Sequence, residues 1–363
     1  MVVGISPNGR STYAGEGPPT RLLVATIDGI ADLERSGSSG EWRRGPTALD
    51  GLHISSILVE PMRGGIFAGI HGSGLYRSLD GGSTWELKTQ GLTASHVFTV
   101  AAVQRHGEVV LYAGTEPVHL FRSTDYGDTW EELPALPAMR QDCWTFPAPP
   151  HAAHTKHITF DPADPDTLLV SVEQGGLFKS TDGGQSWREF DSYAKPTDRA
   201  YKDVHRCLLH PSDPNVLYIT GGTGFFRSPD GGETWEHLTD RTWRIAYPDA
   251  LVFSPFDDSE LFMAGSAGSP GRWPQTHHAD AAIARSRDGG RTFEILAGGL
   301  PEQWRGNVEA MSVYRWADRF ALFAATTDGD VFMSENGGDA WSRIASGLAP
   351  ISKVGHYRNL AAV

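Results

Sequence analysis

The sequence predicts an all-β fold, a β-propeller of seven four-stranded antiparallel blades, and three observations carry this prediction. A motif of the form Ser-x-Asp-x-Gly-x-Thr-Trp recurs along the chain, with its serines at Ser78, Ser123, Ser180, Ser228, Ser286 and Ser334. The copies lie roughly 45 to 58 residues apart, which is the period of a four-stranded propeller repeat. The 363 residues also include 42 glycines and 23 prolines, as expected for many short strands joined by turns.

The motif is predicted to hold the hairpin between the third and fourth strands of each blade. In the copy from Leu75 to Trp85, Asp80 can accept hydrogen bonds from the backbone of its own turn. Gly82 permits a positive φ where the chain reverses. Trp85 then begins the outer strand and packs between neighbouring sheets. The motif aspartates are therefore expected to hold turns and to do no chemistry.

On these residues the chain resembles the bacterial-neuraminidase-repeat (BNR, Asp-box) β-propellers. That superfamily includes sialidases, xyloglucanases, the sortilin ectodomain and a photosystem II assembly factor. The resemblance implies the scaffold and leaves the chemistry open, because its members share a fold and differ in function. The nearest match to the sialidase Arg-Ile-Pro motif is Trp243-Arg-Ile-Ala-Tyr-Pro, which is interrupted and lies mid-chain, so a sialidase is not favoured.

We expect residues 1–20 to form an N-terminal arm and residues 21–363 to form a single propeller domain. A degenerate first repeat ends at Trp42 and lacks an inner strand. The tail that begins at Lys353 is expected to supply it. In this scheme the C-terminal strand completes the first blade and leaves no open sheet edge.

Composition narrows the class of partner. The net charge of −13 argues against nucleic acid and against an anionic membrane surface. The first twenty residues lack the apolar core of a signal peptide, and no apolar run is long enough to span a bilayer. Two cysteines, Cys143 and Cys207, do not indicate a disulfide scaffold. We therefore expect a cytoplasmic protein with a small-molecule substrate, and the sequence leaves its oligomeric state open.

Histidines recur where the inner strands are predicted to begin. Aligning these strand starts places His at five of seven positions, with Asp249 and Glu309 at the other two. Inner strands line the central channel, so the imidazoles should converge at its mouth, and imidazole is a common ligand of divalent transition metals. The sequence thus predicts a site for Fe, Zn, Cu or Mn with the ligands His53, His96, His157, His205 and His356.

Carboxylates and aromatic side chains are expected at the same mouth. Carboxylates there could orient ligating histidines or act as general bases, and the candidates for catalysis are Glu116, Glu173, Asp203 and Glu309. Long loops on this rim carry aromatic and basic residues, which could wall a substrate pocket. The candidates for substrate binding are His71, Trp144, Tyr201, Trp243, Arg244, Trp273 and Trp304.

Three functions remain open at this point. The favoured one is a metal-dependent hydrolase, lyase or oxygenase that acts on an aromatic or sugar-like molecule. The second is a metal-free glycoside hydrolase or lyase that uses two carboxylates. The third is a non-catalytic binding or assembly propeller. The chain has neither a Gly-x-Ser-x-Gly elbow nor a Gly-Lys-Ser/Thr phosphate loop, so serine hydrolase and nucleotide-dependent functions are not supported.

Overall fold

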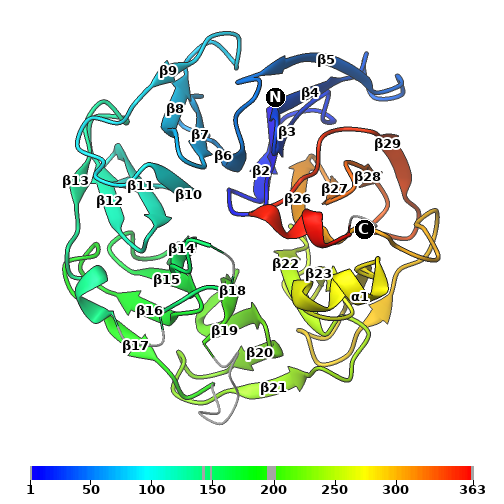
Figure 1. Ribbon diagram of the computed structural model, residues 1–363. Helices are drawn as coiled ribbons and strands as arrows, with labels where there is room; N and C mark the ends of the chain where they lie inside the picture. The colour runs from blue at the N-terminus through cyan, green and yellow to red at the C-terminus, as the bar shows by residue number, and fades with distance from the viewer. Residues whose placement is uncertain (1, 141–143, 148, 194–201, 361–363) are drawn as a thin grey trace.

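The computed structural model is a seven-bladed β-propeller, which confirms the predicted fold class. It describes residues 2–140, 144–147, 149–193 and 202–360, so the predicted site residue Tyr201 and Cys143 lie outside the described residues. Figure 1 shows the seven sheets arranged around a central axis. Helical structure in the described residues is confined to η1 (Pro137–Met139), η2 (Pro270–Arg272), α1 (Trp273–Thr276) and η3 (Gly355–Leu360).

Blades 2 to 6 each consist of four consecutive antiparallel strands. From the axis outwards, blade 2 contains β6 (Ile54–Val59), β7 (Ile66–Ile70), β8 (Gly74–Ser78) and β9 (Glu86–Leu87). Blade 3 contains β10 (His96–Arg105), β11 (Glu108–Glu116), β12 (Leu120–Ser123) and β13 (Glu131–Glu132). Blade 4 contains β14 (His154–Phe160), β15 (Leu168–Glu173), β16 (Gly176–Ser180) and β17 (Arg188–Phe190). Blade 5 contains β18 (Val204–His210), β19 (Asp213–Gly221), β20 (Gly224–Ser228) and β21 (Glu236–Thr239). Blade 6 contains β22 (Tyr247–Phe253), β23 (Leu261–Ser266), β24 (Ala282–Ser286) and β25 (Glu294–Ile295).

Blades 1 and 7 also contain N-terminal strands. Blade 1 has the order β1 (Val2–Ile5), β3 (Arg21–Thr26), β4 (Gly29–Glu34) and β5 (Arg43–Ala48). Blade 7 has five strands, β2 (Thr12–Ala14), β26 (Val308–Trp316), β27 (Arg319–Thr326), β28 (Val331–Ser334) and β29 (Ser342–Ala345). The second strand of a blade is buried on both faces between its neighbours, which is why β7 is an unbroken apolar run.

The repeated motif holds its hairpins as predicted. In blade 4, the backbone N–H of Gly184 donates to Ser180 Oγ at 2.8 Å, and that hydroxyl donates to Asp182 Oδ1 at 2.7 Å. Hydrogen bonds from Ser186 stabilise the Asp182 carboxylate and lower its pKa to about 2. The indole of Trp187 closes the turn by donating to the carbonyl of Gly184 at 3.1 Å. The motif residues therefore hold the turn.

The N-terminal residues close the ring, and the predicted closure by a C-terminal strand is wrong. β1 pairs in parallel with β3 as the innermost strand of blade 1, and β2 pairs in parallel with β26. The expected arm of residues 1–20 thus contributes two strands to the sheets. Val3 and Ile5 are fully buried there, whereas the tail ends in η3 and forms no strand over residues 353–360. β1 is an apolar segment, and its burial as the innermost strand of blade 1 is favourable.

An N-terminal loop, residues 6–11, joins β1 to β2 inside the central channel. The guanidinium of Arg206 donates to the carbonyl of Pro7 at 3.0 Å, and the hydroxyl of Thr99 donates to the carbonyl of Asn8 at 2.8 Å. The backbone N–H of Asn8 donates to the carbonyl of Ser55 at 3.3 Å. These contacts come from blades 2, 3 and 5, so the N-terminal loop fills the channel below its mouth.

A register shift interrupts the first strand of blades 2 to 7 near its start, which is the pattern of a β-bulge. One residue of each strand is left without a partner at this point, and these are Ser55, Phe98, Lys156, His205, Asp249 and Glu309. All six are buried. Lys156 of blade 4 reaches Asp249 of blade 6, which requires both side chains to point towards the axis.

The closure of the ring by residues 2–5 yields a first prediction. Ile5→Ala removes fully buried methylene groups and should lower the free energy of unfolding by about 3 kcal/mol. Thr12→Ala, at an exposed position of the neighbouring strand, should change it by less than about 0.5 kcal/mol. Urea unfolding of both variants measures the difference. Equal, small effects would show that residues 2–5 are not packed in the sheet.

Candidate functional site

Four buried charged residues form a closed ring of ion pairs at the channel mouth. Lys353 Nζ lies 2.7 Å from Asp249 Oδ1 and 3.0 Å from Glu173 Oε1. Lys156 Nζ lies 3.2 Å from Glu173 Oε2 and 3.4 Å from Asp249 Oδ1. Lys156, Glu173, Asp249 and Lys353, called the ion quartet below, therefore alternate in charge. This alternation is what allows four charges to be buried together.

The pKa values of the ion quartet follow from this arrangement. Burial alone would lower the pKa of Lys353, but Asp249 and Glu173 outweigh it and hold that pKa well above its ordinary value. Burial likewise opposes ionisation of Glu173, yet the two lysines keep its pKa well below the ordinary value. Burial lowers the pKa of Lys156. Glu173, Asp249 and Lys353 are thus held in their charged forms.

The C-terminal segment, residues 351–360, supplies Lys353 and lies over the channel mouth (Figure 1). The imidazole Nε2 of His53 lies 2.8 Å from the carbonyl oxygen of Ser352, and that of His71 lies 2.7 Å from the carbonyl oxygen of Lys353. The backbone N–H of Lys353 donates to Glu309 Oε2 at 2.8 Å. Two predicted site residues, His53 and His71, therefore hold this segment in place.

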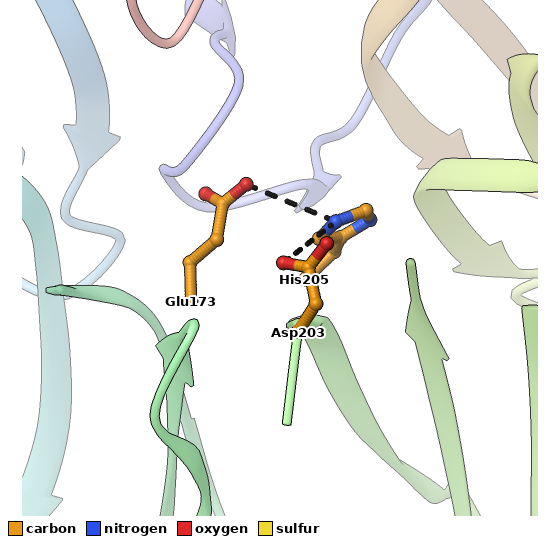
Figure 2. A group of neighbouring side chains, drawn as sticks. All are labelled: Glu173, Asp203 and His205. Carbon is orange, nitrogen blue, oxygen red and sulfur yellow. Dashed lines mark ion pairs between the residues drawn. The ribbon is translucent and has the colours of Figure 1, made fainter. Parts of the chain in front are cut away.

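Three ligand-type atoms converge beside the ion quartet. Figure 2 shows Glu173, Asp203 and His205 pointing towards one another. His205 Nε2 lies 3.4 Å from Asp203 Oδ1 and 3.8 Å from Glu173 Oε1, and the three atoms are all within 4.8 Å of one another. Asp203 Oδ1 and His205 Nε2 make no hydrogen bond among the described residues, and Glu173 Oε1 has the Lys353 ammonium at 3.0 Å as its ion-pair partner. These residues are called the Glu-Asp-His triad below.

Surrounding contacts fix the orientation and charge of the Glu-Asp-His triad. His205 Nδ1 lies 2.7 Å from the carbonyl oxygen of Pro248, so Nδ1 carries a proton, and in the neutral ring Nε2 would present its lone pair to the carboxylates. Asp203 is 5% exposed, and it pairs with no lysine or arginine in the part of the chain that the structure describes. A buried carboxylate without a cation is costly, which indicates that a positive charge belongs beside it.

A cavity of about 940 Å³ opens next to the triad, between blades 4 to 6 and the C-terminal segment. Asp203 and Tyr247 lie in its wall, together with His356 and Phe146. The hydroxyl of Tyr247 lies 3.4 Å from Asp203 Oδ2. Burial and the neighbouring Asp203 carboxylate raise the pKa of Tyr247 well above its ordinary value, so the phenol keeps its proton. The triad therefore borders a space large enough for a small organic molecule.

The five histidines predicted as metal ligands do not form one centre. Among the described residues, the Glu-Asp-His triad is the group whose ligand atoms meet closely enough, and it contains only His205. His157 faces the N-terminal loop, in a separate cavity of about 430 Å³ that Asn8 also lines. His356 contacts Phe146 and Trp273, and burial lowers its pKa to about 3.

The β-bulges explain why the predicted histidines do not occupy equivalent positions in their strands. Aligned by the bulge, the residue equivalent to His96 is His154 in blade 4 and Asp203 in blade 5. The sequence alignment had matched His96 with His157 and His205 because it followed residue type. An extra residue in each strand cannot be seen from the sequence pattern, since the side-chain alternation is broken only once.

The structure also brings two predicted carboxylates, Glu116 and Glu173, together with His154, which the sequence analysis did not name as a site residue. His154 Nε2 lies 2.8 Å from Glu173 Oε2, and His154 Nδ1 lies 3.5 Å from Glu116 Oε2. Burial opposes protonation of His154, but the two carboxylates outweigh it and raise its pKa. Sequence reasoning also missed the roles of Lys156, Lys353 and Tyr247. Lys156 occupies the bulge of its strand, and this position is visible only in the structure.

Most of the predicted aromatic wall packs the loops against the blades. Trp144, Trp273 and Trp304 are buried, and Trp243 is half-buried against Phe293. None of these four tryptophans lies among the described residues that line the large cavity. Arg244 donates to both the carbonyl and the carboxylate of Asp280 and so holds the long loop after β23.

Comparisons with known proteins support the scaffold. A profile of the family "Sortilin, neurotensin receptor 3" matches residues 73–203. The vacuolar protein sorting/targeting protein 10 of Neosartorya fischeri is 36% identical over 58 residues, as is that of Aspergillus fumigatus. Each alignment covers 16% of this chain and 4% of the relative, so the chain spans a small part of these proteins.

Solved structures extend the likeness to nearly the whole chain. An ancestral GH74 enzyme matches 81% of this chain and 39% of its own, with a TM-score of 0.64 and 16% identity. YCF48 bound to D1 peptide matches 91% of both chains, with a TM-score of 0.57 and 14% identity. In blades 2 to 6, the serine of each motif donates to its aspartate, which is the hydrogen bond of the Asp-box turn.

The chain is a propeller of the BNR/Asp-box type. At these identities the solved structures establish the fold of this Asp-box propeller and no more. In the described residues, no helix has the length and apolar character needed to cross a membrane.

Glu309 gives a prediction for pH dependence. Burial, followed by the nearby Asp249 carboxylate, raises the pKa of Glu309 to about 7 from an ordinary value of 4.5. The folded state therefore holds this proton more tightly than the unfolded state, and the associated stability is lost as pH rises from about 4.5 to about 7. Glu309→Gln stays neutral, so its stability relative to the native protein should rise across this window.

Urea unfolding at a series of pH values measures that difference. Glu233→Gln, at an exposed position far from the channel, is the matched control and should give a flat difference curve. Parallel curves for the native protein and Glu309→Gln would contradict the raised pKa.

Proposed function

We propose that this Asp-box propeller is a metal-dependent enzyme whose divalent ion is bound by Glu173, Asp203 and His205. The observation that carries the proposal is the convergence of three ligand atoms, two of which make no hydrogen bond among the described residues, beside a cavity of about 940 Å³. The proposal keeps the predicted metal dependence, replaces the predicted ring of histidines by one imidazole and two carboxylates, and assigns a hydrolase acting on a small, sugar-like molecule.

The distances fit a small transition metal. Ligand atoms about 2.0–2.2 Å from a tetrahedral zinc lie roughly 3.3–3.6 Å apart. The separations from His205 Nε2, 3.4 and 3.8 Å, are within a small side-chain movement of this geometry. One imidazole and two carboxylates also suit Mn²⁺ or Fe²⁺, so the identity of the ion stays open between these metals.

Three protein ligands leave a coordination position for a water or a substrate oxygen, as in catalytic zinc sites. A bound divalent ion would lower the pKa of such a water and polarise the substrate. Asp203 lies in the wall of the cavity, which places this open position where a substrate can reach it. The protonated hydroxyl of Tyr247, beside Asp203, can donate a hydrogen bond to a substrate oxygen.

The ion quartet has a supporting role in this proposal. Lys353 and Lys156 hold the two oxygens of Glu173 and so fix the direction of its remaining lone pairs. The carbonyl of Pro248 does the same for the His205 imidazole. The chain thus positions all three ligands before any ion arrives, which lowers the cost of binding it.

A metal-free pair of catalytic carboxylates is less well supported. Such a pair must flank the substrate. Asp203 is the one carboxylate among the described residues that line the cavity, while Glu309 is bonded to the C-terminal segment. The likeness to GH74 enzymes, including a xyloglucanase from Xanthomonas campestris, favours a sugar-like substrate only at the level of the fold.

Metal analysis tests this proposal. Protein produced without a histidine tag should carry or take up zinc, and Asp203→Asn and His205→Gln should each abolish binding of one equivalent. Elemental analysis and calorimetric titration with Zn²⁺ provide the measurement. Glu233→Gln and His237→Gln, which are exposed residues of the same types, should leave the stoichiometry unchanged.

Activity is tested on a panel of chromogenic glycosides and esters. Hydrolysis should be lost on treatment with a chelator, return when zinc is restored, and fall at least about 100-fold in Asp203→Asn. An unchanged metal content in both triad variants would end the proposal. A bound metal without hydrolysis of any member of the panel would instead favour a binding function.

A further inference from the structure

A second cavity lies in the channel below the bulges, beside the N-terminal loop, and is called the lower cavity below. It has a volume of about 430 Å³, and β6, β10 and β14 form the rest of its wall. It shares no lining residue with the large cavity beside the Glu-Asp-His triad. The lower cavity is therefore a separate place where a small molecule can bind.

The wall of the lower cavity carries positive charge. Among the described residues that line it there is one arginine, Arg10, and no aspartate or glutamate. The Nε of Arg10 donates to the carbonyl of Thr12 at 2.6 Å, and its guanidinium pairs with no carboxylate in the described part of the chain. The whole chain has 44 acidic residues and a net charge of −13, so a wall without carboxylates sets this cavity apart.

A second guanidinium lies directly behind this wall. Arg206 is 2% exposed and donates to Ser11 Oγ at 3.2 Å, and Ser11 lines the lower cavity. An arginine keeps its charge even when it is buried. Arg206 forms no ion pair within the ranges that the structure describes, and a buried charge without a counter-ion is costly. An anion in the lower cavity would offset this cost.

The side-chain amide of Asn8 also lacks a partner. Asn8 is 1% exposed and lines the lower cavity, and its backbone is held by Ser55 and Thr99. Its Nδ2 and Oδ1 make no hydrogen bond among the described residues. Because buried polar groups are nearly always paired, this amide indicates a ligand that both accepts and donates hydrogen bonds.

His157 adds a second acceptor to the wall. Burial and the Arg206 guanidinium hold the pKa of His157 well below its ordinary value, so the ring is neutral. The hydroxyl of Thr159 donates to the carbonyl of Cys207 at 2.6 Å. The contact of 3.1 Å between that hydroxyl and His157 Nδ1 therefore uses a proton on Nδ1. The lone pair of the ring is then on Nε2, which can accept a hydrogen bond from a ligand hydroxyl.

We propose that the lower cavity binds a small organic anion that also carries hydroxyl groups, such as a hydroxy acid or a sugar phosphate. The acidic group of the ligand faces Arg10 and the Nδ2–H of Asn8, in the field of Arg206. The ligand hydroxyls donate to Asn8 Oδ1 and His157 Nε2. This site does not depend on the proposed enzyme activity, because it shares no residue with the Glu-Asp-His triad.

Calorimetric titration of the full chain with two probes, L-malate and glucose 6-phosphate, tests this inference. At least one probe should bind with one equivalent, and at least about tenfold more tightly than its matched control. The controls are succinate, which lacks the hydroxyl of malate, and glucose, which lacks the phosphate. Asp203→Asn should bind the same probe equally well, because the triad takes no part in this site.

Two substitutions in the wall locate the bound probe. Arg10→Gln removes the charge of a half-buried side chain and should weaken binding at least about tenfold. Asn8→Asp keeps the shape of the side chain but places a carboxylate against the acidic group of the probe, so binding should be lost. Arg43→Gln, at an exposed position of β5, is the matched control for charge and should leave the affinity unchanged.

The pattern across these variants identifies the site. Weaker binding in Arg10→Gln and Asn8→Asp, with unchanged binding in Asp203→Asn, supports the lower cavity. Binding that is lost in Asp203→Asn but unchanged in Arg10→Gln overturns the inference, because the anion would then occupy the triad. Equal losses in Arg10→Gln and Arg43→Gln overturn it too, as does the absence of binding by both probes. Should Arg10→Gln fail to fold, Asn8→Asp provides the same comparison.

Discussion

A one-residue bulge near the start of the first antiparallel strand of blades 2 to 7 is the constraint on which the centre of this propeller depends. Without it, the alternation of a regular strand would direct Lys156, His205 and Asp249 between blades, where apolar residues pack. With it, these side chains meet at the axis. Buried charges persist only when they are paired, so a bulge that turns a charged side chain to the axis requires a complementary charge from another blade or from the C-terminal segment.

Both ends of the described chain are used to fill the axis. The N-terminal loop occupies the channel below the bulges, where Arg206 and Thr99 hold it, and the C-terminal segment delivers Lys353 from above. In the described part of the chain these two segments occupy much of the channel, and a cavity of about 430 Å³ remains beside the N-terminal loop. The larger open space lies beside the axis, bounded by Tyr247 and the loop that contains η2.

The sequence was informative where a local motif determines the structure. Ser180, Asp182 and Gly184 make their hydrogen bonds within one turn, so the hairpins, the blades and the fold class could be predicted from spacing alone. The way in which the ring closes could not be predicted from the sequence. β1 is a four-residue apolar strand, and its pairing with β3 depends on burial in the complete ring.

The candidate site was predicted in part. Glu173, Asp203 and His205 were all named as site residues from the sequence, and the structure brings these three together. Their grouping was not predicted, because the alignment followed histidines and passed over the bulges. The role of Lys353 depends on a segment that was expected to be a strand, and no periodicity in the tail indicates an ammonium group placed between two carboxylates.

The pairing of β2 with β26 has a consequence for the order of assembly. Thr12 lies opposite Val313, so an early segment of the chain obtains its partner only when the last blade is formed. Contacts this distant in sequence are slow to form, because a long loop of chain must close first. On a translating ribosome, β2 would therefore lack its partner until the last blade is made, whereas β1 finds β3 early.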